Sequence, residues 1–173
     1  MGADVETIRI EGGLLADLYA QHADEALRLS YLLTGDGALA EDLVQDAFVR
    51  VAGRLLHLRD PGGFHAYLRK TIVNLARSHY RRRAVERRYL ERQTEAPPTD
   101  PDDLSDRERL RRALMALPIG QRTAIVLRYF EDLSEAQTAD LMGRHTRAVK
   151  SLVSRGMGTL RTTVGRTTVG EDT

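Results

Sequence analysis

A strongly basic segment in the first half of the chain carries side chains suited to nucleic-acid binding. Between Phe64 and Arg92 stand nine arginine or lysine residues and two glutamates, a net charge of +7 in a protein whose overall net charge is +1. A helix through this segment would place the following polar residues on the side away from its apolar stripe: Asn74, Arg77, Ser78, Arg81 and Arg82. Such groups bind phosphates and unstacked bases. The pattern favours a polyanionic partner, and a solvated charged face is the alternative.

Two aromatic residues, Phe64 and Tyr67, stand beside a glycine loop at the start of this basic segment. An aromatic ring in this position is able to contact a base that has been extruded from a duplex. Phe64 also falls on the apolar side of the helix, so core packing is the alternative for both rings, and we favour it for Tyr67.

A helix–turn–helix pattern near the C-terminal end offers a second surface for DNA. Ser134 followed three residues later by Gln137 forms a capping box, and Gly143 supplies the turn before a final helix. The exposed candidates on that helix and just before it are Arg144, Thr146, Arg147, Lys150, Ser151, Ser154 and Arg155. Arginine pairs with guanine, whereas Ser, Thr and Lys suit phosphates. Two helices joined by a glycine turn also occur as simple packing units, which is the alternative.

An acidic stripe marks the helix expected at about 39–56. Its outer face carries Asp42, Gln45, Asp46 and Val49, opposite an apolar side that includes Phe48. Paired carboxylates suit acid–base catalysis or a metal ion. However, this helix has no histidine or third carboxylate at ligand spacing, and the five histidines of the chain are scattered along the sequence. We therefore expect no catalytic residue, no metal site and no cofactor. Two interpretations of the acidic stripe stay open: a surface that docks another protein, or a solvated face.

The elements that must position these residues are all helical. Three helices in the first half, at about 14–34, 39–56 and from 64 onward, have apolar stripes that would share one core. The sequence Asp60-Pro61-Gly62-Gly63 breaks the second helix. The acidic, proline-rich stretch at 96–103 is neither helix nor strand and divides the chain in two. The prediction is an all-α protein of two small helical domains joined by a flexible acidic linker.

The domain boundaries follow from these patterns. They are a flexible N-terminus at 1–13, a first domain at 14–92, the linker at 93–107, a second domain at 108–161 and a flexible threonine-rich tail at 162–173. The chain has no cysteine, no apolar run long enough for a membrane span and no secretory signal. We expect a cytoplasmic protein.

Several motifs in a fixed order resemble the extracytoplasmic-function sigma factors, the smallest class of RNA polymerase sigma factors, and in particular their SigE-like actinobacterial branch. The segments that carry the resemblance are Ala40–Val51, Tyr67–Asn74 with Arg81–Arg83, Leu117–Pro118, Gln121–Arg122, Leu127–Ala136 and Val149–Ser151. The resemblance covers about Leu14 to Arg161. It implies that the first domain is sigma region 2 and the second is sigma region 4.

The resemblance also implies roles that periodicity does not give. The polymerase-binding residues would be Asp42, Gln45, Asp46, Phe48 and Val49, on a helix that grips the clamp helices of the largest polymerase subunit. The loop at 59–63 and the helix after it would recognise and melt the −10 element, with Arg77 to Arg83 following the DNA backbone. The −10 residues would be Phe64, Asn74, Arg77, Ser78, Arg81 and Arg82. The helix from Thr146 would read the −35 element. The implied partners are core RNA polymerase (clamp helices and flap region), promoter DNA and an anti-sigma factor.

Two alternatives belong to other functional classes. A stand-alone helix–turn–helix regulator would explain the second half but not the acidic stripe or the basic helix. A DNA-processing enzyme would need a set of metal ligands or a nucleophile with its base, which the sequence does not offer.

The family pattern has a small residue and a Ser or Thr cap where this chain has Arg144-His145. Loss of that cap would cost about 1 kcal/mol unless Thr146 replaces it.

Overall fold

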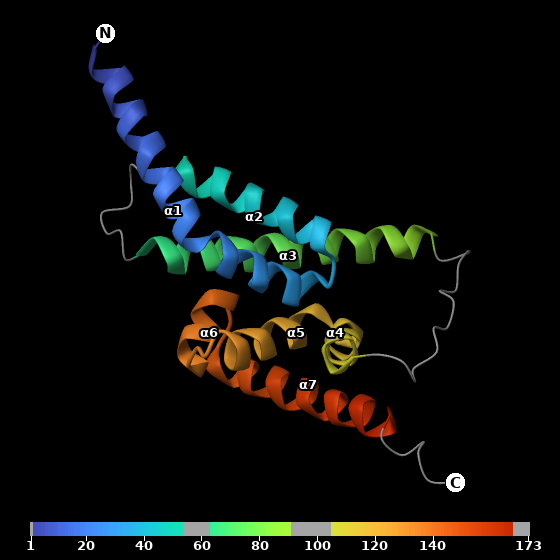
Figure 1. The fold of residues 1–173 in the computed structure, drawn as a ribbon. Helices are drawn as coiled ribbons and strands as arrows, with labels where there is room; N and C mark the ends of the chain where they lie inside the picture. Colours follow the sequence, from blue (N-terminus) through green and yellow to red (C-terminus); the bar gives the residue numbers. More distant parts are fainter. Residues whose placement is uncertain (1, 54–62, 91–104, 168–173) are drawn as a thin grey trace.

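The computed structural model describes residues 2–53, 63–90 and 105–167, and within these ranges every regular element is a helix (Figure 1). The first half contains α1 (Gly2–Thr34), α2 (Gly37–Ala52) and α3 (Gly63–Leu90). The second half contains α4 (Asp106–Ala116), α5 (Ile119–Ile125), the π-helix η2 (Val126–Phe130), α6 (Glu135–Met142) and α7 (Thr146–Thr167). The first three helices form one layer and the remaining helices pack beneath it. The predicted all-α fold is confirmed.

The layer of α1, α2 and α3 is held together by the apolar stripes predicted from the sequence. Leu29 and Leu33 of α1, Val51 of α2 and Ile72 of α3 are all at most 2% exposed. α1 ends at Gly35, whose φ of +68° is readily adopted by glycine. Asp36 then caps α2 by accepting a hydrogen bond from Leu39 N at 3.1 Å.

α1 begins earlier than expected. The sequence predicted a flexible N-terminus at 1–13, whereas in this structure the helix already starts at Gly2. This segment contains no proline, and the glycines at 12 and 13 lower helix propensity without breaking the hydrogen-bond ladder.

The helix–turn–helix of the second half forms as predicted. Ser134 Oγ accepts from Gln137 N, and the Gln137 side chain accepts from Ser134 N, which completes the capping box. Gly143 ends α6 in the left-handed region, at φ +60°. α7 runs on to Thr167, six residues beyond the predicted domain end, so the start of the tail is helical. The hydroxyls of Thr162 and Thr163 donate to the carbonyls of Gly158 and Thr159 one turn back, which is compatible with a helix.

The two halves of the chain pack against each other over a continuous core. Buried residues of α3 such as Val73 belong to the same apolar cluster as Leu127, Met142 and Val149 of the second half. Arg122 of α5 is 3% exposed and its Nη1 donates to Leu33 O of α1 at 2.6 Å. Arg111 of α4 donates to Gly35 O at 3.0 Å. The sequence predicted two domains and a linker; it did not predict this interface between them.

Candidate nucleic-acid interface

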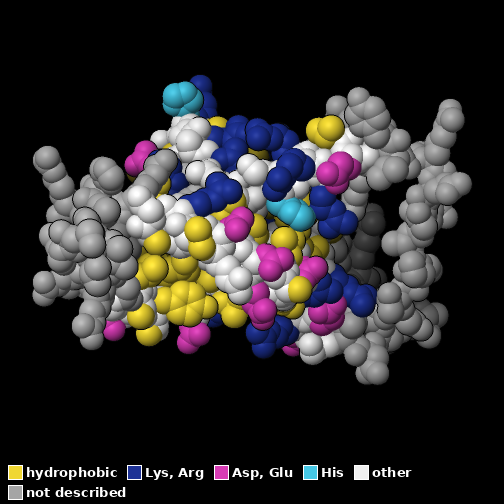
Figure 2. Space-filling model, turned by 90° about the horizontal axis from the view of Figure 1, so that it is seen from above, with side chains coloured by type: hydrophobic (Ala, Val, Ile, Leu, Met, Phe, Trp, Pro, Cys, Tyr) yellow, Lys and Arg dark blue, Asp and Glu magenta, His cyan; other side chains and the backbone are white. Residues whose placement is uncertain are grey.

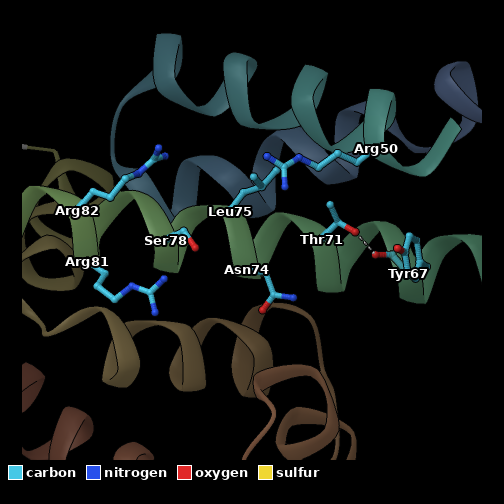
Figure 3. Close-up of a pocket in the computed structure, with 8 residues that line it drawn as sticks. All are labelled: Arg50, Tyr67, Thr71, Asn74, Leu75, Ser78, Arg81 and Arg82. Carbon is cyan, nitrogen blue, oxygen red and sulfur yellow. Dashed lines mark hydrogen bonds between the residues drawn. The ribbon is translucent and has the colours of Figure 1, made fainter. Parts of the chain in front are cut away.

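A groove of about 640 Å³ lies along α3, on its border with α2 (Figure 3). Its lining residues are Arg50 of α2 and, from α3, Tyr67, Thr71, Asn74, Leu75, Ser78, Arg81 and Arg82. Arg50 extends from α2 along α3, and Asn74 and Arg81 point away from α2. Three guanidinium groups and no carboxylate line the groove, so it is positively charged. Amide, hydroxyl and aromatic groups between the arginines give it the donors, acceptors and ring surface that unpaired nucleotides bind.

The burial of the two aromatic residues is the reverse of what the sequence led us to expect. Phe64, expected to contact a base, is 1% exposed, and its ring packs against Phe48 and His22 at centroid distances of 6.0 and 5.4 Å. Tyr67, expected in the core, packs partly against it but also lines the groove. The residues are three positions apart and share a helix face, so spacing did not show which ring the other helices would cover.

Four of the five polar α3 residues selected from the sequence line the groove: Asn74, Ser78, Arg81 and Arg82. The fifth, Arg77, is half-buried, and its Nη1 donates to Met142 O in the second half at 2.7 Å. Burial lowers the pKa of Arg77, and the neighbouring charges of Arg144 and Arg81 lower it further. Arg77 therefore joins the two halves in this structure.

The N-terminal part of α7 presents a second polar surface. Every residue selected there from the sequence is exposed: Arg144, Thr146, Arg147, Lys150, Ser151, Ser154 and Arg155. Val149 behind them is fully buried and fixes the orientation of the helix. The helix begins at Thr146, and the carbonyl of His145 accepts from Ala148 N and Val149 N. This is the arrangement of a recognition helix that offers its first turns to the major groove.

The acidic stripe of α2 is exposed. Asp42, Gln45 and Asp46 face solvent and Val49 is 73% exposed, so an apolar side chain stands among acids. Phe48, which the resemblance counted among the polymerase-binding residues, is 5% exposed, and its ring centroid lies 4.7 Å from that of Tyr19. Its side chain therefore supports α2 from inside. Figure 2, seen from above the first half, shows basic side chains gathered toward one edge and most acidic side chains in the opposite half of the face.

Two histidines that the sequence treated as scattered come together in the structure. His22 of α1 and His65 of α3 stack with ring centroids 5.2 Å apart, and His65 Nε2 lies 2.9 Å from Glu25 Oε1. Burial lowers the pKa of His22, the charge of His65 lowers it further, and Glu25 opposes both effects. The spacing of His22 and Glu25, three apart on one helix, was visible in the sequence; the approach of His65 was not.

The loop at 59–62 and the acidic segment at 91–104 lie outside the described residues. The −10 role that the resemblance gave the loop and the flexibility expected of the acidic linker remain predictions. Within the described residues, no helix is both long and apolar enough to cross a membrane.

The fold and its two polar faces define an all-α DNA-binding protein with a helix–turn–helix in one half and a basic groove in the other. Residues 18–86 match the family model for sigma-70 region 2, and residues 107–160 match that for sigma-70 region 4. The RNA polymerase sigma-E factor of Streptomyces coelicolor is 34% identical over 139 residues, which are 80% of this chain and 78% of that protein. The sigma factor SigE of Mycolicibacterium smegmatis is 33% identical over 153 residues, 84% of this chain and 59% of that protein.

Among solved structures, the sigma factor RpoE in complex with the anti-sigma factor NepR from Bartonella quintana has the same fold, with a TM-score of 0.70 and 23% identity. The alignment covers 87% of this chain and 96% of that one. The chain belongs to the sigma-70 family of RNA polymerase sigma factors, in its extracytoplasmic-function group. Proteins of this family direct core RNA polymerase to promoter DNA, and in general they catalyse no reaction themselves.

Proposed function

We propose that the exposed acidic face of α2 binds core RNA polymerase, that the α3 groove holds the opened −10 element, and that the start of α7 reads the −35 element. The observation that carries this assignment is the presence of two separate polar, basic faces, the α3 groove on one half of the chain and the exposed start of α7 on the other. A stand-alone helix–turn–helix regulator needs only the second. A protein that both recognises and opens a promoter needs both.

The α3 groove suits single-stranded DNA better than a duplex. Arg81 and Arg82 lie one helical turn beyond Ser78 and provide charge for successive phosphates. Asn74 offers a side-chain donor and acceptor to a base edge, and the ring of Tyr67 borders the same groove two helical turns before it. Phe64 is buried and takes no part in this contact.

The start of α7 suits duplex DNA. Arg144 and Arg147 are exposed and able to reach guanine in the major groove, whereas Ser151 and Ser154 suit phosphate contacts. Lys150 Nζ lies 3.3 Å from Glu135 Oε2 of α6. On DNA binding, Lys150 would leave this exposed carboxylate and contact a phosphate, because an exposed ion pair contributes little stability.

The polymerase face on α2 consists of Asp42, Gln45, Asp46 and Val49. Exposed carboxylates around an apolar side chain form a small surface that pairs with a basic, partly apolar helix face. We further propose that the protein acts in the cytoplasm, is not an enzyme, and is held inactive by an anti-sigma factor, as the complex of RpoE with NepR suggests.

The test is run-off transcription with core polymerase from Streptomyces coelicolor, the source of a similar sigma factor, on a promoter library, with and without this protein. Specific transcripts that require the protein are expected. The sequences shared upstream of their start sites would give the −35 and −10 elements. Duplex binding by the isolated protein, with neither polymerase binding nor transcripts, would favour the regulator instead.

A further inference from the structure

A cluster of five polar side chains lies where α1, α3 and the end of η2 meet. His22 and Glu25 come from α1, His65 and Arg69 from α3, and Glu131 follows η2; together they line one small pocket. The ligand atoms of His22, Glu25 and His65 all lie within 4.8 Å of one another. These three residues are half-buried, so water and ions reach them.

The hydrogen bonds of His65 are mismatched. Its Nε2 lies 2.9 Å from Glu25 Oε1, a contact in which the nitrogen must donate, and 3.2 Å from Arg69 Nη2, a contact in which it must accept. A neutral imidazole nitrogen does one or the other. Protonating His65 would satisfy Glu25 but place two cations against each other. No protonation state of His65 satisfies both contacts.

The charges of the cluster do not balance either. Within the cluster, Arg69 is the single cation paired with two carboxylates. Its Nε lies 2.7 Å from Glu131 Oε2, and its Nη2 lies 3.2 Å from Glu25 Oε1. The Glu131 side chain is 7% exposed and that of Glu25 is 36% exposed, so the guanidinium is more tightly held by Glu131. One negative charge on Glu25 is left beside two imidazoles when both are neutral.

We propose that His22, Glu25 and His65 form a binding site for a divalent transition-metal ion such as Zn²⁺. Two imidazole nitrogens and one carboxylate oxygen are a donor set that zinc and its neighbours bind, with water completing the coordination. A dication would bond the His65 lone pair and the Glu25 carboxylate at once, which removes the mismatch. Arg69 would then release Glu25 and keep Glu131.

The site is independent of the proposed DNA and polymerase faces, because none of its three ligands belongs to them. It does touch the interface between the halves, since Arg69 contacts both Glu25 and Glu131. The competing interpretation is that Arg69 serves as the permanent cation of the cluster and excludes a metal.

The test begins with the full-length protein stripped of metal and titrated with Zn²⁺ against a chromophoric chelator. One equivalent is expected to bind, and Co²⁺ is expected to give visible absorption bands typical of nitrogen and oxygen ligands. Wild-type protein that binds no stoichiometric Zn²⁺ or Co²⁺ would overturn the proposal without any variant.

Variants then assign the ligands. His22→Ala and His65→Gln should abolish one-site binding and the Co²⁺ bands, whereas His145→Ala, which removes an exposed histidine before α7, should retain both. Arg69→Gln removes the competing cation and should tighten Zn²⁺ binding severalfold, because a positive charge 3.2 Å from both Glu25 and His65 opposes a dication. Equal binding by wild type, His22→Ala and His65→Gln would place the metal elsewhere. Circular dichroism melts of each variant confirm that a loss of binding is not a loss of fold.

Discussion

At the scale of single residues, Arg122 is a charged side chain with a structural task. Its guanidinium donates to the carbonyls of Leu114, Met115 and Leu117 in its own half and of Leu33 in the other half. It also lies 4.8 Å from the centre of the Tyr80 ring. One buried cation thereby satisfies the end of α4 and binds it to the end of α1.

Arg122→Ala should lower the free energy of unfolding by about 3 kcal/mol, because hydrogen bonds from a charged donor are worth about 1.5–3 kcal/mol and several buried carbonyls lose theirs together. Urea denaturation followed by circular dichroism measures the change. Arg28→Ala removes an exposed arginine of α1 and serves as the matched control. A loss in Arg122→Ala no larger than in that control would show that water replaces the guanidinium.

Glu108 gives a residue-scale prediction about pH. Hydrogen bonds and charge from Arg111, with those from Arg112, hold the pKa of Glu108 at about 2, below its ordinary value of 4.5. A carboxyl whose pKa is lower in the folded state stabilises the fold above its unfolded pKa, and this contribution is lost as pH falls from about 4.5 to 2. Glu108→Gln should therefore be less stable than wild type at neutral pH, and the difference should shrink across that window.

Urea unfolding at a series of pH values tests this expectation for Glu108. Glu86→Gln, which changes an exposed carboxyl of α3, is the control. A difference between Glu108→Gln and wild type that does not vary with pH would mean that the ion pairs of Glu108 add nothing to stability.

At the scale of elements, α7 combines a buried and an exposed face whose substitution should have separate effects. Arg147→Ala should weaken binding of a −35 duplex by about 1–3 kcal/mol if its guanidinium reads a guanine. Electrophoretic mobility shifts with holoenzyme and a set of −35 variants measure this. Arg161→Ala, an exposed arginine farther along α7, is the matched control. A loss that is uniform across the −35 variants would assign Arg147 to a phosphate.

The acidic face of α2 should behave as a docking element. Asp46→Arg should reduce affinity for core polymerase severalfold or more, because the new arginine would repel the basic surface expected on the polymerase. The melting temperature should stay unchanged, because Asp46 is exposed. Fluorescence anisotropy of labelled protein against core polymerase measures it. Asp17→Arg makes the same charge change on an exposed site of α1. Equal affinities for the two variants would contradict the assigned face.

The elements also show how far the sequence predicts this fold. Apolar periodicity gave the core positions of α2 and α3, and local chemistry gave the capping box at Ser134 and the turn at Gly143. The sequence patterns failed where contacts between distant chain segments determine which side chains are buried or meet. Phe64 is buried because the rings of His22 and Phe48 cover it, and His65 meets His22 only because α1 and α3 pack together. Neither contact leaves a signal in local spacing.

At the scale of the whole molecule, the halves are joined by groups that are also assigned to DNA. Arg77 donates to Met142 O, and the pKa of Arg77 is lowered by burial and then by the neighbouring charges of Arg144 and Arg81. Basic residues of α3 and of the turn before α7 are therefore close together in this arrangement, which brings like charges near each other. On the proposal that Arg77 follows the DNA backbone, Arg77 must first leave Met142, so we expect the halves to separate at this point when both faces bind a promoter.

Glu131 offers the means to test that separation. Its carboxylate lies 2.7 Å from Arg69 Nε with little solvent exposure, so Glu131→Arg would place two guanidinium groups against each other in a partly buried site. The variant should keep its helical content, increase in radius of gyration in small-angle X-ray scattering, and bind promoter DNA with core polymerase at least as well as wild type. Glu86→Arg repeats the charge change on an exposed α3 position and should remain compact. If Glu131→Arg stays compact, the apolar cluster shared by Val73, Leu127 and Val149 holds the halves together without the ion pair. If it opens but loses promoter binding, the contact between the halves is needed for DNA recognition and does not oppose it.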